Sequence, residues 1–418
     1  MARASRKGRR AARPRGGAET EHEELTRLRP RFPILRRKNY LINNSLGAMP
    51  AATYDALREF ADAWAHEGVL AWDDWLPMVV ESGNRVGKLM GAPPGSVMMH
   101  QNVSTLVGIV LSALDYRERN AIVATDLNFP SVLYNLYEQE RRGARVVLVP
   151  GGGLNVDTQR VVEAIDDQTA LVCLDLVLFR SSGLLDVAPI VEAAHRHGAL
   201  LLLDVYQAIG AVPIDVAALG VDFAVGGSVK WLCGGPGAAY LYVAEWARRN
   251  LRPAATGWFS HKRPFAFEVG RVDPADDIHR YMGGSPSVPA LYSARSGYEV
   301  VAEVGVKRIR ARSLSLTERL IQGADAQGLT VNTPRDPARR GGTVCVDFEG
   351  ADVAHDELIE RGILIDYRPN CGIRVSPHFY NTAAECDAVL EAIAEIRASR
   401  RFQGRLRQRP ARAAAATR

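Results

Sequence analysis

The stretch "GGSVKWLCGGPGAAYLYV", residues 226–243, holds a single lysine, Lys230, in an otherwise small and apolar run. The run predicts buried sheet and tight turns. Lysine is rarely buried, because taking an ammonium group out of water is costly unless the group is neutral or paired. Lys230 therefore needs a partner or a chemical role, and the glycine-rich turn that follows it needs a reason as well.

Before this stretch, short apolar runs alternate with helical patterns from about residue 96 onward. The helical stretches 131–143 and 187–198 both end at a glycine, as helices often do. The apolar runs are "AIVATD" 121–126, "ARVVLVP" 144–150, "ALVCLDL" 170–176, "ALLLLDV" 199–205 and "VDFAVGG" 221–227. Continuous apolar strands between such helices predict an α/β fold with a mainly parallel sheet that is covered on both faces.

After residue 243 the pattern changes to a second, smaller α+β unit. Residues 254–290 are rich in glycine, proline and aromatic residues and predict irregular connections, and residues 291–323 predict one long helix. Two further strands and a helix at 382–398 follow. The expected organisation is a basic tail (1–30), an N-terminal segment that packs with the small domain (31–70), a large domain (71–285), a small C-terminal domain (286–398) and a second basic tail (399–418).

The net charge of +5 comes from the two ends of the chain. Residues 1–16 and residues 400–418 each contain seven basic side chains and no acidic one. Both ends lack the apolar residues that folding requires, so we expect them to be disordered. Arginine-rich tails also suggest a rival class of function, a nucleic-acid-binding protein, although nucleic acid is not the partner that the rest of the chain indicates.

The chain carries no pattern for export, membrane insertion or metal binding. No apolar segment follows the charged N-terminus, and no run approaches the roughly 20 apolar residues that span a bilayer. The five cysteines are scattered, with no C-x-x-C, which argues against a disulfide framework and against a zinc site. We therefore expect a cytoplasmic protein with no metal site and no membrane association.

An aspartate, Asp204, ends the strand "ALLLLD", and Lys230 follows the next predicted strand. Ligands bind at the carboxyl ends of the strands in open α/β sheets, so both side chains should lie on the ligand side. One interpretation is a structural ion pair that closes the sheet edge. The other is the pair that pyridoxal phosphate chemistry requires, a carboxylate on the ring nitrogen and a lysine that forms a Schiff base.

Two other stretches bear on this choice. "HQNVSTLVGIVLSAL" 100–114 begins with small polar residues and continues as an apolar helix, so its free N–H groups can hold a phosphate, although Ser104 can equally be an ordinary helix cap. "LNFPS" 127–131 places Phe129 in a strand-to-helix turn, where its ring can stack on a flat cofactor or simply join the core.

Taken together and in order, these stretches resemble the fold-type-I, class V aminotransferase family of pyridoxal-phosphate enzymes. The resemblance covers about residues 35–398. Three further motifs are similar to the kynureninase-like branch of that family: "NNSLGAMP" 43–50, "GWFSH" 257–261 and "YRPNCGIRVSPHFYN" 367–381. The resemblance implies a large domain with a mainly parallel sheet, a smaller α+β C-terminal domain, and pyridoxal 5′-phosphate as cofactor.

The resemblance also implies a role for each matching residue. Lys230 would form the Schiff base and carry a proton between the substrate Cα and the cofactor, Asp204 would keep the ring nitrogen protonated, and Arg374 would bind the substrate α-carboxylate. The other implied roles are ring stacking by Phe129, a hydrogen bond to the ring O3′ by Gln207, phosphate binding by Val103, Ser104 and Ser228, phosphate binding from a second subunit by Trp258 and Ser285, and substrate contacts by Asn44 and Trp72. The expected assembly is a homodimer with shared active sites.

Three positions depart from the kynureninase pattern and bear on the reaction. Val229 stands where those enzymes have a tyrosine, Val132 where they have an aspartate, and Gln207 where they have a histidine. The missing phenol and carboxylate are candidate acid–base groups. The leading expectation is kynureninase-like cleavage of an amino-acid side chain between Cβ and Cγ, through an external aldimine.

Two other activities of the family stay open. One is ordinary class V transamination, which needs little beyond the lysine, the aspartate and the arginine. The other is the activity of a cysteine desulfurase or C–S lyase, which needs a thiolate on a loop before the arginine. Only "PNCGI" separates Arg368 from Arg374, which is too short for that loop, and we interpret Cys371 as a bystander.

Overall fold

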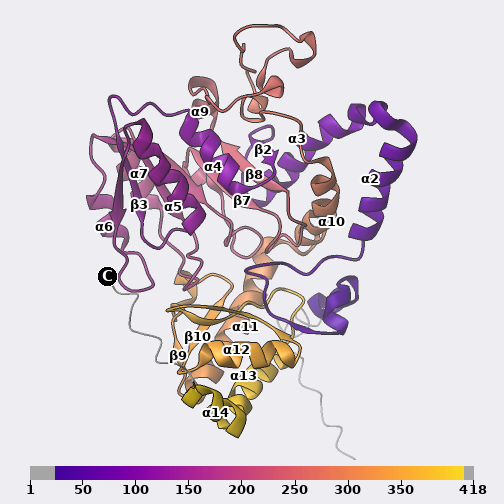
Figure 1. Cartoon of the computed structure of the whole chain (residues 1–418), viewed down its shortest axis with the longest axis vertical. Coiled ribbons are helices and arrows are strands. Elements are labelled where there is room, and N and C mark those ends of the chain that lie inside the picture. The colour runs from indigo at the N-terminus through magenta and orange to yellow at the C-terminus, as the bar shows by residue number, and fades with distance from the viewer. Residues whose placement is uncertain (1–23, 409–418) are drawn as a thin grey trace, which may run out of the picture.

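The computed structural model describes residues 24–408, and a seven-stranded sheet forms the centre of its larger part (Figure 1). The strand order is β2-β8-β7-β6-β5-β3-β4. The five strands from β7 to β4 are parallel, whereas β8 runs antiparallel to both of its neighbours. The strands are β2 (Val97–His100), β3 (Ala121–Thr125), β4 (Arg145–Val149), β5 (Thr169–Asp175), β6 (Leu200–Asp204), β7 (Phe223–Gly227) and β8 (Ala239–Val243). The mainly parallel sheet confirms the predicted fold class.

Helices pack against this sheet and bury its apolar strands. Helices α6 and α7 contact β3, β5 and β6, while α3 and α4 contact β2, β7 and β8. Helix α10 packs against both α2 and α3 at the side of the sheet (Figure 1). The helices are α2 (Thr53–Glu67), α3 (Trp72–Leu89), α4 (Val103–Ser112), α5 (Pro130–Tyr137), α6 (Thr158–Glu163), α7 (Ala188–Arg196), α8 (Val216–Leu219), α9 (Glu245–Asn250) and α10 (Val288–Val304).

The smaller part is built on a four-stranded antiparallel sheet of order β12-β13-β10-β9. Its strands are β9 (Thr330–Val331), β10 (Val344–Asp347), β12 (Asp366–Arg368) and β13 (Gly372–Val375), and its helices are α11 (Val306–Ala326), α12 (Ala351–Glu360), α13 (Ala383–Ala398) and α14 (Arg400–Gln408). Its apolar core is separate from that of the larger sheet. The predicted boundary near residue 285 stays a prediction.

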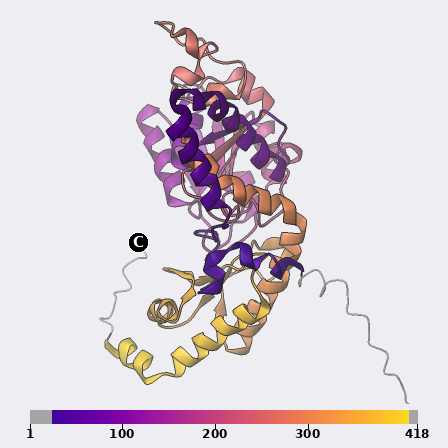
Figure 2. The same cartoon turned by 90° about the vertical axis from the view of Figure 1, so that its right-hand side faces the viewer.

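The segment before α2 joins the two parts. Strand β1 (Asn39–Tyr40) pairs in parallel with β11 (Ile363–Leu364), and Figure 2 shows the N-terminal segment lying against the smaller part. Helix α2 instead packs on α10. The segment therefore contacts both parts.

Connections between these elements include several short 3-10 helices. They are Arg29–Arg31, Pro33–Arg36, Gly68–Ala71, Glu138–Arg142, Trp258–Ser260, Pro264–Ala266, Ile278–Tyr281 and Pro337–Arg339. Three of them lie in the irregular segment between α9 and α10, which projects from the larger part at the top of Figure 1. In the described part of the chain, no helix is long and apolar enough to cross a membrane.

The prediction of one long helix over 291–323 is wrong. The structure has two helices, α10 and α11, which meet at Gly305. Gly305 has a φ of +82°, a conformation that costs glycine little and other residues more. The change of direction lets α10 pack on the larger part while α11 packs on α13 and β9.

Part of each tail that was expected to be disordered is folded. Residues 1–23 and 409–418 lie outside the described residues, but residues 24–30 and 400–408 are ordered. Leu25 and Phe402 are buried, and Arg29 forms an ion pair with Glu385 at 2.8 Å. For these ordered residues the prediction is wrong, because single apolar side chains among the arginines anchor each end to the fold.

Candidate active site

A cavity of about 320 Å³ opens at the carboxyl ends of β5 and β6. The carboxyl ends of parallel strands meet at one edge of a sheet, so residues far apart in the chain converge there. The cavity is lined by Ser45, Asn102, Val103, Ser104, Phe129, Ser131, Val132, Asp175, Val177, Phe179, Asp204, Tyr206, Gln207, Val229 and Lys230. Six predicted site residues therefore come together: Val103, Ser104, Phe129, Asp204, Gln207 and Lys230.

Lys230 follows β7 and lies in the turn that the sequence predicts. Its Nζ lies 4.1 Å from the centre of the Tyr206 ring and 5.7 Å from that of Phe129. Burial lowers the pKa of Lys230 to about 8, partly opposed by the charge of Asp204. A lysine with a lowered pKa has a larger fraction of free amine at neutral pH, which makes it a better nucleophile and base.

The motif "NNSLGAMP" 43–50 contacts the backbone at Val229 and Lys230. Gly47 donates its N–H to Val229 O at 2.7 Å, and a Cβ at Gly47 would lie 2.1 Å from Lys230 O. Only glycine permits this close approach of the two backbones. The N-terminal segment therefore fixes the backbone that carries Lys230.

Asp204 ends β6 and is 7% exposed. Its Oδ1 accepts the N–H of Tyr206 at 2.8 Å. Burial raises the pKa of Asp204 to about 6, against the effects of that hydrogen bond and of Lys230. No ion pair joins Asp204 to Lys230 among residues 24–408, so the structure does not support a structural ion pair at this sheet edge.

Phe129 lies where β3 turns into α5 and is 40% exposed. Its ring meets that of Phe179 edge to face, with centres 5.2 Å apart. On the other side of the cavity, Asn102 caps α4 by accepting the N–H of Thr105 at 2.8 Å. The cap is therefore Asn102 rather than Ser104, and Ser104 lies in the first helical turn beside Val103, where backbone N–H groups have no acceptor within the helix.

Gln207 and Asn44 connect the cavity to the smaller part. The Gln207 Nε2 donates to Asn44 O at 2.9 Å, and its Oε1 accepts from Trp231 Nε1 at 3.0 Å. The side-chain amide of Asn44, with its oxygen toward Arg374, accepts from Nε at 3.1 Å and Nη2 at 3.0 Å. Asn44 thus lies behind the cavity wall rather than in it.

Arg374 lies on β13 and is 3% exposed. Its Nε donates to Asp366 Oδ1 at 2.7 Å, its Nη2 donates to Asp366 Oδ2, and its Nη1 donates to Phe179 O. The edge of the guanidinium formed by Nε and Nη2 is therefore occupied by Asp366. Substrate binding by Arg374 stays a prediction, and it would use the remaining N–H groups of Nη1 and Nη2 or displace Asp366.

Besides Asn44 and Arg374, four more predicted site residues do not line the cavity. The Oγ of Ser228 is buried and lies 2.6 Å from Ala238 O and 2.5 Å from the Tyr298 hydroxyl. Trp72 packs against Trp75 with ring centres 5.3 Å apart, while Trp258 and Ser285 lie in the irregular segment before α10. Their roles stay predictions, and those of Trp258 and Ser285 depend on a second subunit.

Cys371 also lies outside the cavity lining. Its thiol is buried and donates to Arg180 O at 3.0 Å, and the Cys345 thiol donates to the same oxygen at 2.6 Å. All five cysteines have free thiols and are buried.

Sequence reasoning missed four residues of this region: Asp175, Phe179, Tyr206 and Asp366. Asp175 could have been found, because it ends an apolar run in the same way as Asp204. Tyr206 lies two residues after Asp204, directly beyond the apolar run 199–205. Phe179 and Asp366 carry no signal in the sequence, since only the folded contacts bring them to Phe129 and Arg374.

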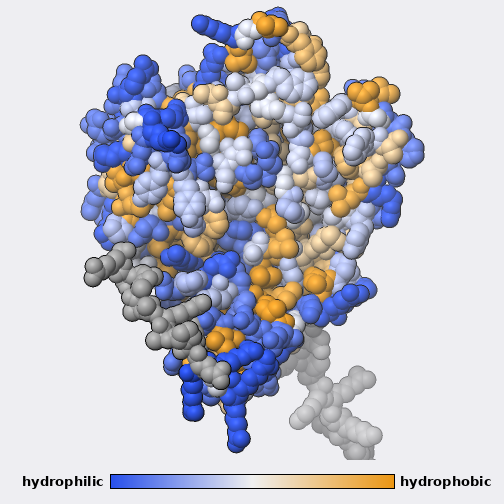
Figure 3. Space-filling view, in the orientation of Figure 1, coloured by the Kyte–Doolittle hydropathy of each residue, from blue (hydrophilic) through white to orange (hydrophobic). Residues whose placement is uncertain are grey.

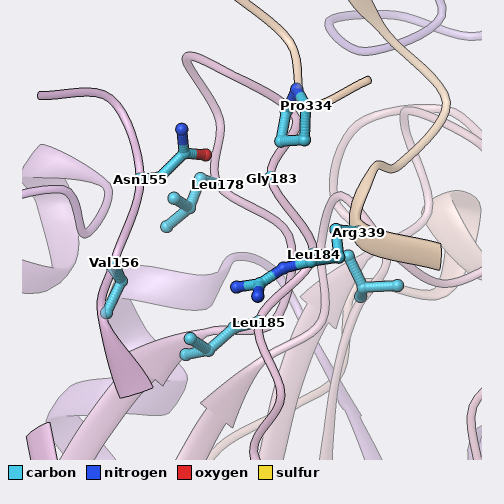
Figure 4. Close-up of a pocket in the computed structure, with 8 residues that line it drawn as sticks. All are labelled: Asn155, Val156, Leu178, Gly183, Leu184, Leu185, Pro334 and Arg339. Atoms are coloured by element: carbon cyan, nitrogen blue, oxygen red, sulfur yellow. The ribbon is translucent and has the colours of Figure 1, made fainter. Parts of the chain in front are cut away.

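A second, smaller cavity of about 200 Å³ lies on the far side of the 177–184 loop (Figure 4). Figure 4 shows the Arg339 guanidinium pointing into it among leucine side chains and Pro334. No acid or lysine lines this cavity. Of these two cavities, only the one at the sheet edge is lined by both a carboxylate and an amine, Asp204 and Lys230.

Comparisons with known proteins agree with this geometry. The family described as aminotransferase class-V matches residues 40–389. The chain is 32% identical to a kynureninase of Pseudomonas fluorescens over 392 residues, which cover 90% of this chain and 92% of that protein. It is 29% identical to an uncharacterized aminotransferase of Bacillus subtilis (strain 168) over 363 residues, 87% of this chain and 95% of that protein.

Among solved structures, a variant of C-DES with glycine covalently linked to its PLP cofactor has a similar fold. The TM-score is 0.80 at 20% identity, and the match covers 88% of this chain and 99% of that chain. At this identity the likeness concerns the fold alone.

Proposed function

The chain belongs to the class V aminotransferase family, and from this premise we propose that it catalyses a kynureninase-like cleavage of an amino-acid side chain between Cβ and Cγ. The enzyme depends on pyridoxal 5′-phosphate and acts on an amino acid. One observation carries the assignment of the site: Lys230 and Asp204 line the same cavity at the ligand edge of the sheet. Neither group has a salt-bridge partner there among the described residues, so both are available to a ligand.

The residues around the cavity fit the cofactor. Asp204 is buried, and its side chain accepts one hydrogen bond, at Oδ1 from the backbone N–H of Tyr206. Its carboxylate would hold the ring nitrogen. Phe129 presents an aromatic ring to the cavity and would cover one face of the cofactor ring. The first turn of α4, with Val103 and Ser104, offers N–H groups and a hydroxyl to a phosphate.

When bound, pyridoxal phosphate withdraws electrons from the bonds at the substrate Cα. Lys230 would bind the cofactor, then take the proton from Cα and return it. Its lowered pKa, about 8, suits this exchange near neutral pH, because general acid–base catalysis is most effective when the pKa lies near the working pH. Tyr206 and Phe129 keep its amino group between two rings and limit the access of water.

Transamination is the second candidate, and a specific observation favours it. Val132 and Val229, which replace an aspartate and a tyrosine of the kynureninase pattern, both line the cavity. An apolar wall supplies no acid or base to the substrate side chain, whereas transamination requires proton exchange only at Cα and on the cofactor. Cys371 lies outside the cavity, which gives no comparable support to desulfurase chemistry.

The proposed assembly is a cytoplasmic homodimer in which Trp258 and Ser285 reach the phosphate of the other subunit. The segment around Trp258 supports it, because Phe265 and Phe267 are 60% and 71% exposed beside it. The irregular segment between α9 and α10, which carries both residues, lies at the top of Figure 3, where apolar residues are exposed. Exposed aromatic clusters of this kind are typical of protein–protein interfaces. Sedimentation of the full chain should give twice the monomer mass, and a monomer at micromolar concentration would contradict this assembly.

A substrate panel tests the reaction. The full chain, loaded with pyridoxal phosphate, is incubated with kynurenine, with cysteine, and with alanine plus a keto acid. Release of alanine together with an aromatic amine supports side-chain cleavage. A new keto acid that forms only when an acceptor is present indicates transamination, and release of sulfide indicates C–S lysis; either of these without alanine release would contradict the leading proposal.

A further inference from the structure

Strands β5 and β6 each end in a buried aspartate, and the two residues are direct neighbours across the sheet. Asp175 pairs in register with Asp204, and they are 5% and 7% exposed. Both line the cavity that contains Lys230. Two carboxylates that share a poorly solvated site cannot both ionise without a large cost, so one of them tends to keep its proton.

The contacts of Asp175 fix it to the turn that presents Phe129. Its Oδ2 accepts the N–H of Phe129 at 3.0 Å, and its Oδ1 accepts from Asn128 Nδ2 at 3.1 Å. The Oδ1 of Asn128 in turn accepts from the N–H and the hydroxyl of Thr125, both at 2.8 Å. Both donors are neutral, and by themselves they lower the pKa of Asp175, but burial and the neighbouring Asp204 outweigh them.

The charged and titratable groups around the pair favour a proton on Asp175 rather than on Asp204. From β6 Asp175 faces the carboxylate of Asp204, from the turn after β7 it faces Lys230, and on its own strand it lies near the Cys173 thiol. Burial and Asp204 raise the pKa of Asp175 well above its usual range. Lys230 interacts more strongly with Asp204 than with Asp175. The negative charge is therefore best placed on Asp204.

The sequence around α5 makes this pair notable. The helix position that carries an aspartate in the kynureninase pattern is Val132 here, and Val132 lines the same cavity. The second carboxyl group of the cavity comes instead from β5. It reaches the site beside Asp204 rather than from the helix that follows Phe129.

We propose that Asp175 is a positioning residue that stays protonated beside Asp204, so that the two carboxyl groups share one proton and present one negative charge, on Asp204, to the bound cofactor. The role toward the cofactor rests on the proposed function. The protonation of Asp175 itself does not, because it follows from groups of this chain alone.

The first test measures protonation directly in the full chain without added cofactor. Infrared spectra at pH 8 should show the C=O stretch of a buried carboxylic acid in the wild type. Asp175→Asn should remove this band, and Asp126→Asn, which changes an exposed acid at the end of β3, should keep it. Absence of the band in the wild type, or its persistence in Asp175→Asn, would overturn the proposal whether or not the protein binds pyridoxal phosphate.

The second test uses the cofactor-loaded protein. Asparagine imitates a neutral aspartic acid, so the pH midpoint of the visible absorption band of Asp175→Asn should stay within about 0.3 units of the wild type, because no charge is lost near Lys230. An ionised Asp175 would give a midpoint about one unit lower or more, and that result would overturn the proposal. Asp204→Asn, which does remove the charge, is the positive control and should shift the midpoint. If no visible band forms in the wild type, the proposed function fails, while the infrared result still decides the proton on Asp175.

Discussion

Two pairs of buried ionisable side chains face each other across neighbouring strands, and they are built in opposite ways. In the smaller sheet, Asp366 on β12 faces Arg374 on β13, and the guanidinium donates two hydrogen bonds to the carboxylate. In the larger sheet, Asp175 on β5 faces Asp204 on β6, with the amino group of Lys230 in the same cavity. In the first pair the positive and negative charges cancel, whereas the second pair consists of two acids.

This difference separates a structural arrangement from a chemical one. Opposite charges with ideal geometry satisfy each other, and removing one partner leaves the other buried without compensation. Two neighbouring buried carboxyl groups beside a lysine cannot both ionise without a large cost and shift each other's pKa, which is the usual condition of groups that exchange protons with a ligand. The comparison supports our proposal that the chemistry takes place at the edge of the larger sheet, with a supporting role for Asp366.

The largest expected effect comes from Lys230. Lys230→Ala should lower the turnover rate by roughly 10³-fold or more, since proton transfer by a positioned side chain alone contributes about 10²–10⁴-fold. Lys88 is exposed near the end of α3 and does not line the cavity, and Lys88→Ala should leave the rate unchanged. Steady-state kinetics with the best substrate of the panel measures both. A rate within tenfold of the wild type in Lys230→Ala would move the chemistry away from this cavity.

Breaking the neutral pair should have the next largest effect, on stability. Asp366→Ala leaves the buried guanidinium of Arg374 without its carboxylate, and the free energy of unfolding should fall by about 3–5 kcal/mol. Urea unfolding followed by fluorescence measures it, with Asp356→Ala on the exposed surface of α12 as control. A loss below about 1 kcal/mol would show that the pair contributes little to the fold, in the range of a surface ion pair.

Removing the charge of Asp204 should instead raise the free energy of unfolding. The pKa of Asp204 is raised in the folded protein to about 6, from 3.8, so the folded state holds its proton more tightly than the unfolded chain. The contribution of Asp204 to the free energy of unfolding of the cofactor-free protein should therefore fall as the pH rises from about 4 to about 6 and then level off, whereas that of Asp175, which keeps its proton to higher pH, should continue to fall. Asp204→Asn should remove this dependence and, at pH 7, raise stability by about 3 kcal/mol at 1.36 kcal/mol per pKa unit.

Urea unfolding at several pH values between 4 and 8 measures that difference. Asp222→Asn is the matched control. Asp222 is also buried, directly before β7, but its Oδ2 accepts the N–H of Leu201 and lies 3.0 Å from His195 Nε2. A stability difference between the wild type and Asp204→Asn that stays constant from pH 4 to pH 6 would contradict the raised pKa of Asp204.

The smallest expected effect concerns the ring of Phe129, the residue whose backbone N–H donates to Asp175. Phe129→Leu keeps an apolar side chain but removes the aromatic face, and the dissociation constant of pyridoxal phosphate should rise by about tenfold, the upper end of an aromatic contact. Tyr134→Leu, an exposed aromatic residue on the same helix α5, is the control and should leave the constant unchanged. Fluorescence titration of the cofactor-free protein measures both. An equal effect of the two substitutions would show that the Phe129 ring does not contact the cofactor.

The larger sheet was predictable because its signals are local. Apolar runs that end in polar residues mark both the strands and their ligand ends, so Asp204 and Lys230 could be placed on one edge without any structure. Asp175 belongs to the same pattern, but "ALVCLDL" continues past it with a leucine, and the end of the strand is not visible in the letters. The break at Gly305 was missed for a similar reason, since the apolar pattern continues on both sides of it.

The partners of Arg374 were not predictable. Asp366 lies eight residues earlier, and only the antiparallel pairing of β12 and β13 brings its carboxylate onto the guanidinium. Phe179 reaches Arg374 from the other sheet through its backbone oxygen. The roles proposed for Trp258 and Ser285 depend on the proposed second copy of the chain, which the pattern of one chain does not describe.

The most direct test of the central claim is a chemical label on the lysine. The full chain is loaded with pyridoxal phosphate, reduced with borohydride and digested, and the peptides are identified by mass. The account predicts that the pyridoxyl group is found on the peptide with "GGSVKWLCGG" and on Lys230 within it. A label on another lysine, or no label on a protein that has bound the cofactor, would contradict it.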